Sequence, residues 1–188
     1  MNHVTLDGVM QGPGRADEDT RDGFEHGGWA VAHADEAVVE KMGERMGGDD
    51  HAFLFGRRTY EQLLASWNDR GGPFKEALNN THKYVASSNS TARLEWPNSA
   101  LLHDDIPAAV AELKRSSAKN LVIMGSGVLI GSLMAAELID EYMLMIHPLV
   151  LGSGRRLFAG GTPTSLRLVE CSTTNKGVMI TVYKPDRV

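Results

Sequence analysis

The stretch FLFGRRTYEQLL, residues 53–64, contains the signals that decide the fold. An apolar run typical of a buried β-strand stops at Gly56, and the residues after the glycine indicate a helix that begins with Arg57, Arg58 and Thr59. Helix starts favour acidic or small capping residues, because the first amide N–H groups carry partial positive charge. Two adjacent arginines are locally unfavourable there, so we expect an anion to be supplied from outside the helix.

Strands and helices alternate from this stretch onward. Strands are expected over residues 51–55, 82–87, 99–103 and 120–125, and helices over residues 57–67, 104–117 and 126–138. Before them, residues 2–8 indicate a short strand, and residues 33–48 indicate a helix that stops at glycines. Such alternation predicts a largely parallel sheet covered by helices.

The last third of the chain has a different pattern. Residues 139–152 and 166–184 are typical of long strands, and Asn175–Gly177 suits the turn of a hairpin. The predicted fold class is therefore α/β: a three-layer sandwich with a mixed, mostly parallel central sheet and an antiparallel C-terminal edge. We find no linker and no internal repeat, so residues 1–188 are expected to form a single domain.

Composition excludes several classes of function. The 188 residues include 19 Lys and Arg against 24 Asp and Glu, a net charge of -5, which argues against nucleic acid as a partner. The single cysteine, Cys171, excludes an internal disulfide and a cysteine-based zinc site, and no metal site is expected. No signal peptide or membrane-spanning segment is recognisable, so we expect a soluble, cytoplasmic protein with no membrane partner.

Three successive strand ends carry residues suited to phosphate. They are Gly56-Arg57-Arg58-Thr59, Ser87-Ser88-Asn89 and Gly125-Ser126-Gly127. Glycine lets a backbone approach a phosphate, helix-start N–H groups donate to it, and arginine adds bidentate contacts. Together they predict a site for an extended phosphate-bearing ligand such as a dinucleotide. Taken singly, each stretch also suits a structural turn or a solvated surface.

Four stretches resemble the dihydrofolate-reductase-like superfamily: VTLDGVMQGPG (4–14), FLFGRRTYEQL (53–63), KYVASSN (83–89) and residues 120–158. The resemblance is greater to the branch that contains the reductase domain of bacterial riboflavin biosynthesis and its stand-alone homologues. It covers nearly the whole chain and implies NADPH as cofactor. The anion expected beside the two arginines would then be cofactor phosphate, and Arg57 would favour NADPH over NADH.

The resemblance also implies which residues bind the cofactor. The adenosine side and the pyrophosphate would be held by Gly56, Arg57, Arg58 and Thr59, with Ser87 and Ser88 near the ribose phosphate. The pyrophosphate and nicotinamide side would be lined by Gly125, Ser126, Gly127, Val128 and Leu129. Val4 and Thr5 would abut the nicotinamide, under a mobile loop that contains Met10 and Gln11.

On the substrate side, the sequence departs from its relatives. The H-x-E…P-C-x-x-C signature of the zinc deaminases is missing, which excludes deaminase activity. Ala34 stands near the place of the carboxylate that holds the pterin in dihydrofolate reductases, so folate reduction is not expected. Its neighbour Asp35 is a candidate catalytic residue or a helix-start acid.

Two further residues are candidates for substrate binding. Trp29 would line the substrate pocket or anchor the loop, and Arg155, in LGSGRRLF, would face the substrate or occupy an exposed turn. His147, in an apolar strand, is interpreted as a core residue.

The function predicted from these residues is that of an NADPH-dependent reductase, acting on a heterocyclic or ribosylaminopyrimidine-type substrate as a homodimer. A non-catalytic NADPH-binding module is the alternative.

Overall fold

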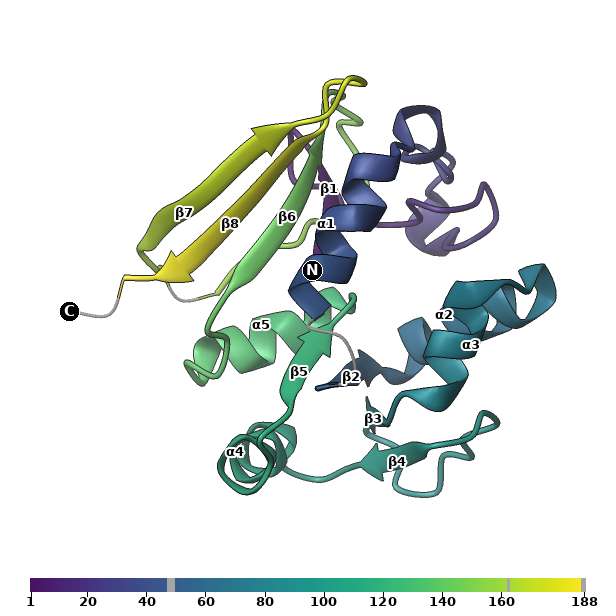
Figure 1. The fold of residues 1–188 in the computed structure, drawn as a ribbon, viewed down its shortest axis with the longest axis vertical. Coiled ribbons are helices and arrows are strands. Elements are labelled where there is room, and N and C mark those ends of the chain that lie inside the picture. The colour runs from purple at the N-terminus through teal and green to yellow at the C-terminus, as the bar shows by residue number, and fades with distance from the viewer. Residues whose placement is uncertain (47–49, 162, 187–188) are drawn as a thin grey trace. The chain divides into compact units, whose positions relative to one another are not determined.

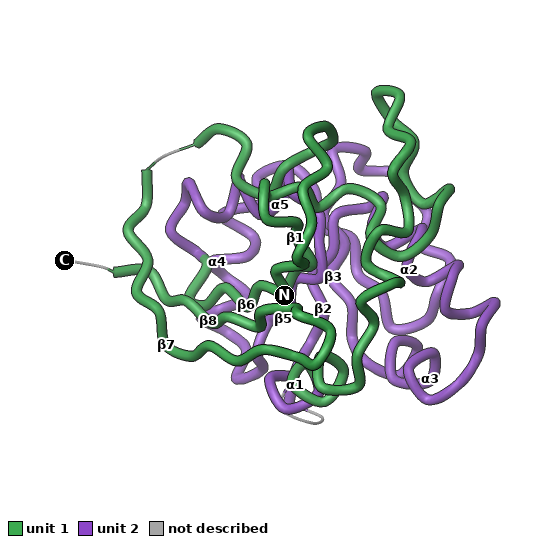
Figure 2. Tube along the Cα trace, turned by 90° about the horizontal axis from the view of Figure 1, so that it is seen from above, with its two compact units in different colours: residues 1–42, 139–188 green, residues 43–138 purple. Residues whose placement is uncertain are grey.

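The computed structural model describes residues 1–46, 50–161 and 163–186. The chain forms two compact units, coloured separately in Figure 2. Unit 1 consists of residues 1–42 and 139–188, and unit 2 of residues 43–138. The expectation of one domain over residues 1–188 stays a prediction. Gly47 and Gly48, which were expected to end the first helix, lie outside the described residues.

Unit 2 is built on a sheet of parallel strands (Figure 1). Its strand order is β4-β3-β2-β5, and every neighbouring pair is parallel. The strands are β2 (His51–Gly56), β3 (Lys83–Ala86), β4 (Ser99–Leu102) and β5 (Asn120–Ile123). β2 is buried along its whole length, because it lies inside the sheet and consists mainly of apolar residues.

Four helices accompany this sheet: α2 (Arg57–Arg70), α3 (Pro73–Asn80), α4 (Ile106–Ser116) and α5 (Gly127–Ala135). In Figure 1, α2 and α3 lie on one side of the sheet and α4 and α5 on the other. The chain crosses the sheet from β2 through β3 to β4 in one direction and from β4 to β5 in the other. Since crossovers between parallel strands are almost always right-handed, this reversal places helices on both faces of the sheet. The three-layer expectation is confirmed for this unit.

Helix α3 was missing from the sequence expectations. It begins at Pro73, a residue whose fixed φ suits the first helical position. It ends against Lys83, whose fully buried Nζ donates hydrogen bonds to the carbonyl oxygens of Leu78 (2.6 Å) and Thr81 (2.7 Å). The Lys83 side chain therefore caps the carbonyl groups at the C-terminal end of α3. In the part of the chain that the structure describes, none of its hydrogen bonds is to an acidic side chain.

Unit 1 contains the mixed sheet, in the order β1-β6-β8-β7. Its strands are β1 (Asn2–Thr5), β6 (Tyr142–His147), β7 (Leu166–Thr173) and β8 (Met179–Pro185). β1 is parallel to β6, whereas β8 is antiparallel to both of its neighbours. The hairpin between β7 and β8 turns at Asn175–Gly177 as predicted, with Gly177 at a φ of 78° that favours glycine.

Helix α1 covers part of this sheet and contributes to its hydrophobic core. Val38 of α1 (Glu36–Met46) packs against Met143 and Met145 of β6 and against Ile180 and Val182 of β8. The segment before α1 contains two short 3-10 helices, η1 (Arg21–Gly23) and η2 (Val31–His33). It is held by hydrogen bonds despite having little regular structure.

The predicted α/β class is confirmed, with its parallel part and its antiparallel C-terminal part. The described strand ladders form two four-stranded sheets, where one central sheet was expected. β6 is also shorter than predicted and ends at His147, because Pro148 has no N–H to continue the ladder. Among the described residues, every helix is too short or too polar to cross a membrane.

Candidate functional site

The three predicted phosphate-binding stretches lie at one edge of the unit 2 sheet. β2 pairs with β3 on one side and with β5 on the other, and Gly56 lies opposite Ala86 in the ladder. The carboxyl ends of parallel strands meet at the same edge, which is where ligands of open α/β sheets bind. The turn after β2 is therefore flanked by Ser87-Ser88 after β3 and by Gly125–Gly127 after β5.

Two of these turns touch each other, and glycine is required at the contact. A Cβ atom built on Gly56 would lie 2.6 Å from Ser126 Oγ and 2.7 Å from Ser126 Cβ, closer than real Cβ contacts. Gly125 has a φ of 77°, and its peptide bond to Ser126 is cis. The starts of α2 and α5 are thus brought together by two residues that are 70 positions apart in the sequence.

The two helix starts at this edge lack the cap that another helix in the unit possesses. The N-cap residues of α2 and α5 are Gly56 and Ser126, and neither makes a side-chain capping hydrogen bond. By contrast, Asp105 caps α4, and its carboxylate accepts from the Ala108 N–H at 3.0 Å. The first-turn amides of α2 and α5 are therefore suited to donate to an anion.

The two arginines of α2 differ in their partners. Arg57 Nη1 lies 2.7 Å from Glu61 Oε1, one turn further along the exposed face of the helix. Arg58 is also exposed, and within residues 1–46, 50–161 and 163–186 it has no ion pair or hydrogen bond. Arg57 thus has a carboxylate partner within its own helix, whereas Arg58 has no partner in the described part of the chain.

The remaining predicted cofactor residues of unit 2 are a mixture of buried and exposed positions. Ser87 is buried, and its Oγ accepts from the Asn89 N–H at 3.0 Å, which shapes the turn after β3. Ser88 is exposed and Thr59 half-buried. At the start of α5, Val128 is 77% exposed, an unusual position for an apolar side chain, whereas Leu129 is buried in the core.

Val4 and Thr5 belong to unit 1, where both are buried. The Thr5 hydroxyl donates to Asp7 Oδ1 (2.6 Å) and accepts from the Val9 N–H (2.9 Å). Asp7 also accepts from the Gly152 N–H at 2.9 Å, so it joins the end of β1 to the LGSGRRL loop. The Thr5 hydrogen bond and these backbone bonds lower the pKa of Asp7 to about 2.

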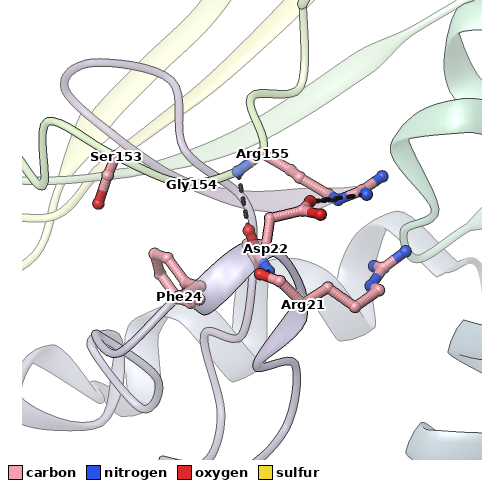
Figure 3. A pocket seen from close by; sticks show the side chains of 8 residues that line it. Arg21, Asp22, Phe24, Ser153, Gly154 and Arg155 are labelled. Carbon is pink, nitrogen blue, oxygen red and sulfur yellow. Dashed lines mark hydrogen bonds and ion pairs between the residues drawn. The ribbon is translucent and has the colours of Figure 1, made fainter.

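Arg155 lines a hollow of about 220 Å³ in unit 1 (Figure 3). Its guanidinium pairs with Asp22 at 2.8 Å, and its backbone N–H donates to Gln11 Oε1 at 2.9 Å. Arg21 on the opposite wall pairs with Asp19. The hollow is smaller than a typical pocket for a drug-sized ligand, so it has room for a small group only.

Trp29 has the geometry of an anchor. Its indole N–H donates to the Gln11 carbonyl oxygen at 2.7 Å, its exposed fraction is 8%, and it clusters with Val9 and Phe24. Gln11 in turn donates from Nε2 to the carbonyl oxygens of Asp19 and Arg21. These bonds fix the 8–28 loop from within.

Asp35 acts on its own helix start. Its Oδ1 accepts from the Ala37 N–H at 3.0 Å, directly before α1. This is the bond of a helix-start acid, the second of the two roles that the sequence left open.

A group of histidines in unit 1 was not predicted from the sequence. His3 Nδ1 and His147 Nε2 lie 2.9 Å apart, and the His147 ring also contacts His33 and Trp29, at centroid distances of 5.7 and 5.1 Å. His147 is 1% exposed, so it is buried as predicted. Burial lowers the pKa of His147 and of His3 to about 4. No sequence signal places residues 3 and 147 together, since only the pairing of β1 with β6 does so.

None of the described residues forms a cluster of His, Cys, Asp and Glu side chains suited to a metal ion. Cys171 is exposed and carries a free thiol.

This chain is similar to known proteins in sequence and in fold. YyaP of Bacillus subtilis (strain 168), an uncharacterised protein, is 29% identical over 189 residues, which cover 96% of this chain and 90% of YyaP. A deaminase/5-amino-6-(5-phosphoribosylamino)uracil reductase of Thermotoga maritima superposes with a TM-score of 0.65 at 15% identity, over 98% of this chain and 55% of that one.

Dihydrofolate reductase of Enterococcus faecalis, solved in complex with NADP(H), superposes with a TM-score of 0.64 at 15% identity, over 98% and 94% of the two chains. At these identities the two structures establish a shared fold. The family is established by the sequence, because the model of the RibD C-terminal domain matches residues 2–180. The order of strands, the three strand-end turns and this match lead to one conclusion: the chain belongs to the RibD C-terminal domain family.

Proposed function

We propose that the protein is an NADPH-dependent reductase that transfers a hydride to a heterocyclic or ribosylaminopyrimidine-type substrate. The observation that carries the proposal is the pair of uncapped helix starts, α2 and α5, which meet at one sheet edge beside Arg58. Membership of the RibD C-terminal domain family supports a reductase. The similar structures named for a uracil reductase and for dihydrofolate reductase with NADP(H) support the substrate class and the cofactor.

The residues of unit 2 would hold the cofactor phosphates. The N–H groups that begin α2 and α5 would donate to phosphate oxygens, and Arg57 and Arg58 would add charge-assisted hydrogen bonds. Ser87 and Ser88 after β3, and Thr59 in the first turn of α2, would contribute hydroxyl groups. NADPH supplies the hydride when bound, and the chain contributes orientation and exclusion of water.

The residues of unit 1 would hold the substrate and the nicotinamide. Val4 and Thr5 would abut the nicotinamide ring, with Thr5 fixed by its bonds to Asp7 and Val9. Arg155 would bind an anionic group of the substrate and exchange its exposed pair with Asp22 for it. Exposed pairs are worth little, so this exchange costs about 1 kcal/mol or less. The proton that accompanies the hydride would come from water.

One observation favours a non-catalytic NADPH-binding module as a second candidate. Asp35 is occupied by the start of α1 and Arg155 by Asp22, so both candidate substrate groups already have partners within the chain. The two candidates share the cofactor site and differ in turnover.

We also propose that the protein is a homodimer. β7 is the edge strand of the unit 1 sheet, and it leaves Leu168 and Val169 about half exposed, at 50% and 44%. Edge strands of this kind are natural sites for pairing with a second chain. Light scattering at micromolar concentration should give twice the monomer mass, and a monomeric mass would refute the dimer.

Thermal denaturation with NADPH tests the cofactor site. Millimolar NADPH should raise the melting temperature, because a ligand that binds the folded state adds RT ln(1 + [L]/Kd) to its stability. Arg58→Ala should reduce this shift, whereas Arg115→Ala should not. Arg115 is the matched control, since it forms an exposed arginine–glutamate pair on α4. No shift of the parent protein would refute the proposal.

Turnover separates the two candidate functions. The protein is incubated with NADPH and a panel of pteridines and ribosylaminopyrimidines while nicotinamide absorbance is followed. Consumption of NADPH that depends on one of these substrates supports the reductase. Binding of NADPH without turnover on any member of the panel supports the module.

A further inference from the structure

Three imidazole rings of unit 1 form a group to which the proposed function assigns no role. His147, at the end of β6, contacts His3 of β1 and His33 of η2, and the edge-on Trp29 ring lies against it. Only one hydrogen bond joins the three rings, between His3 Nδ1 and His147 Nε2 at 2.9 Å. The Nδ1 atoms of His33 and His147 are buried and have no hydrogen-bond partner among the described residues.

The two bonded rings are neutral at neutral pH. The titratable groups that face them are the Met1 amino group, whose charged form disfavours charge on His3, and the other histidines, which disfavour charge on His147. No hydrogen bond or ion pair within the described ranges joins any of the three rings to a carboxylate. Burial is the largest cause, and together with these groups it lowers both pKa values to about 4.

Neutrality decides which ring donates. A neutral imidazole carries one N–H and one bare nitrogen, so the contact between the two rings needs one donor and one acceptor. If His3 donated from Nδ1, the proton of His147 would have to sit on its own Nδ1, as a buried N–H group without a partner. Orphaned buried N–H groups are rarer than buried acceptors that lack a partner. We therefore assign the hydrogen bond as His147 Nε2–H donating to His3 Nδ1.

This hydrogen bond determines the protonation of the other ring nitrogen of His3, Nε2. With Nδ1 accepting from His147, the proton of the neutral His3 ring is on Nε2. His3 is only partly buried, and its Nε2 is not among the buried unpartnered nitrogens. His3 precedes Val4 on β1, and its side chain lies on the same face of the strand as that of Thr5.

Resting on the proposed reductase function, we propose that His3 is a substrate-binding residue whose neutral Nε2–H donates a hydrogen bond to a carbonyl or ring-nitrogen acceptor of a planar heterocycle. His147 is the positioning residue that holds the His3 tautomer. A neutral imidazole can polarise such an acceptor without giving up its proton, and the hydrogen bond strengthens as hydride addition to the substrate places negative charge there. The proton that completes the reduction still comes from water, so both rings leave the reaction unchanged.

Nuclear magnetic resonance of the histidine rings tests the assignment without any ligand. Protein labelled with ¹⁵N in histidine is recorded at pH 7, and two-bond ¹H–¹⁵N correlations distinguish protonated from bare ring nitrogens. We expect a proton on Nε2 and a bare Nδ1 in both His3 and His147. A proton on Nδ1 of His147 would overturn the proposal, because His3 would then present an acceptor.

Binding of 5,6-diaminouracil, a neutral pyrimidine with two carbonyl groups, tests the contact. Calorimetry should show that His3→Leu weakens binding of this probe about tenfold. His3→Gln places an amide N–H near the position of Nε2 and should bind within threefold of the parent. His103→Leu is the matched control, since His103 is exposed and pairs with Asp104. Equal affinity of His3→Leu and the parent would overturn the proposal.

Two readouts separate this inference from the proposed function. NADPH affinity is measured in parallel, and His3→Leu should leave it within twofold. His147→Phe should weaken binding of the probe severalfold. In the histidine spectrum, the proton of His3 should then be distributed between Nδ1 and Nε2, a change that a merely structural role of His147 would not cause. A parent that binds NADPH but not millimolar 5,6-diaminouracil would overturn the substrate contact alone. A parent that binds the probe but not NADPH would refute the reductase.

Discussion

Replacing Arg57 with alanine should weaken the binding of NADPH and leave the binding of NADH nearly unchanged. The two cofactors differ only by the phosphate on the adenosine ribose, so discrimination needs a cation near that phosphate. A charge-assisted hydrogen bond contributes roughly 1.5–3 kcal/mol. Arg57 must first weaken its exposed pair with Glu61, which is worth about 0.3–0.5 kcal/mol as a pair one helical turn apart. The net loss for Arg57→Ala is then about 1–2.5 kcal/mol, or about 5- to 70-fold in NADPH affinity.

The assay is a titration of each cofactor at fixed salt, because exposed charges are screened by salt. NADH affinity should change by less than twofold in Arg57→Ala. Arg115→Ala removes a comparable exposed arginine from α4 and should alter neither affinity. Equal losses for NADPH and NADH would refute the reasoning. Arg57 would then be a pyrophosphate contact, and Arg58, which has no partner in the described part of the chain, would be the residue that selects NADPH.

Four further substitutions have defined outcomes. Gly56→Ala should cost about 1–3 kcal/mol in urea denaturation, because its Cβ would overlap Ser126, and the Ser126→Gly background should restore stability. Lys83→Met should cost about 2–4 kcal/mol in the same measurement, since it removes the hydrogen bonds that end α3. The pKa of His147 in the folded protein, about 4, lies below its unfolded value of 6.5. Its contribution to the free energy of unfolding is therefore fully present above pH 6.5 and is lost as the pH falls toward 4. His147→Phe should remove about 2 kcal/mol of the loss between pH 7 and pH 5. Asp35→Asn should leave turnover within a few-fold, because Asp35 serves its own helix start, and a hundredfold loss without unfolding would contradict this role.

Local sequence signals were sufficient for most elements of the fold. Apolar runs predicted β2 and β5, and the helical pattern of residues 104–117 predicted α4, which the structure confirms. The turn residues at Asn175–Gly177 predicted the hairpin. These signals are local because strand burial, helix capping and tight turns each depend on residues within a few positions of one another. Helix α3 was missed although Pro73 offered a local signal of the same kind.

The sequence by itself determined the chemistry available at the strand ends, whereas their contacts were decided by tertiary structure. Parallel pairing of β2 with β3 and β5 placed three turns at one edge, and only that packing made Gly56 indispensable beside Ser126. Pairing of β1 with β6 brought His3 to His147 across 144 positions. Such contacts join segments whose sequences are independent of each other, so no periodicity or spacing encodes them. The burial that keeps these histidines neutral exists only once the chain has folded.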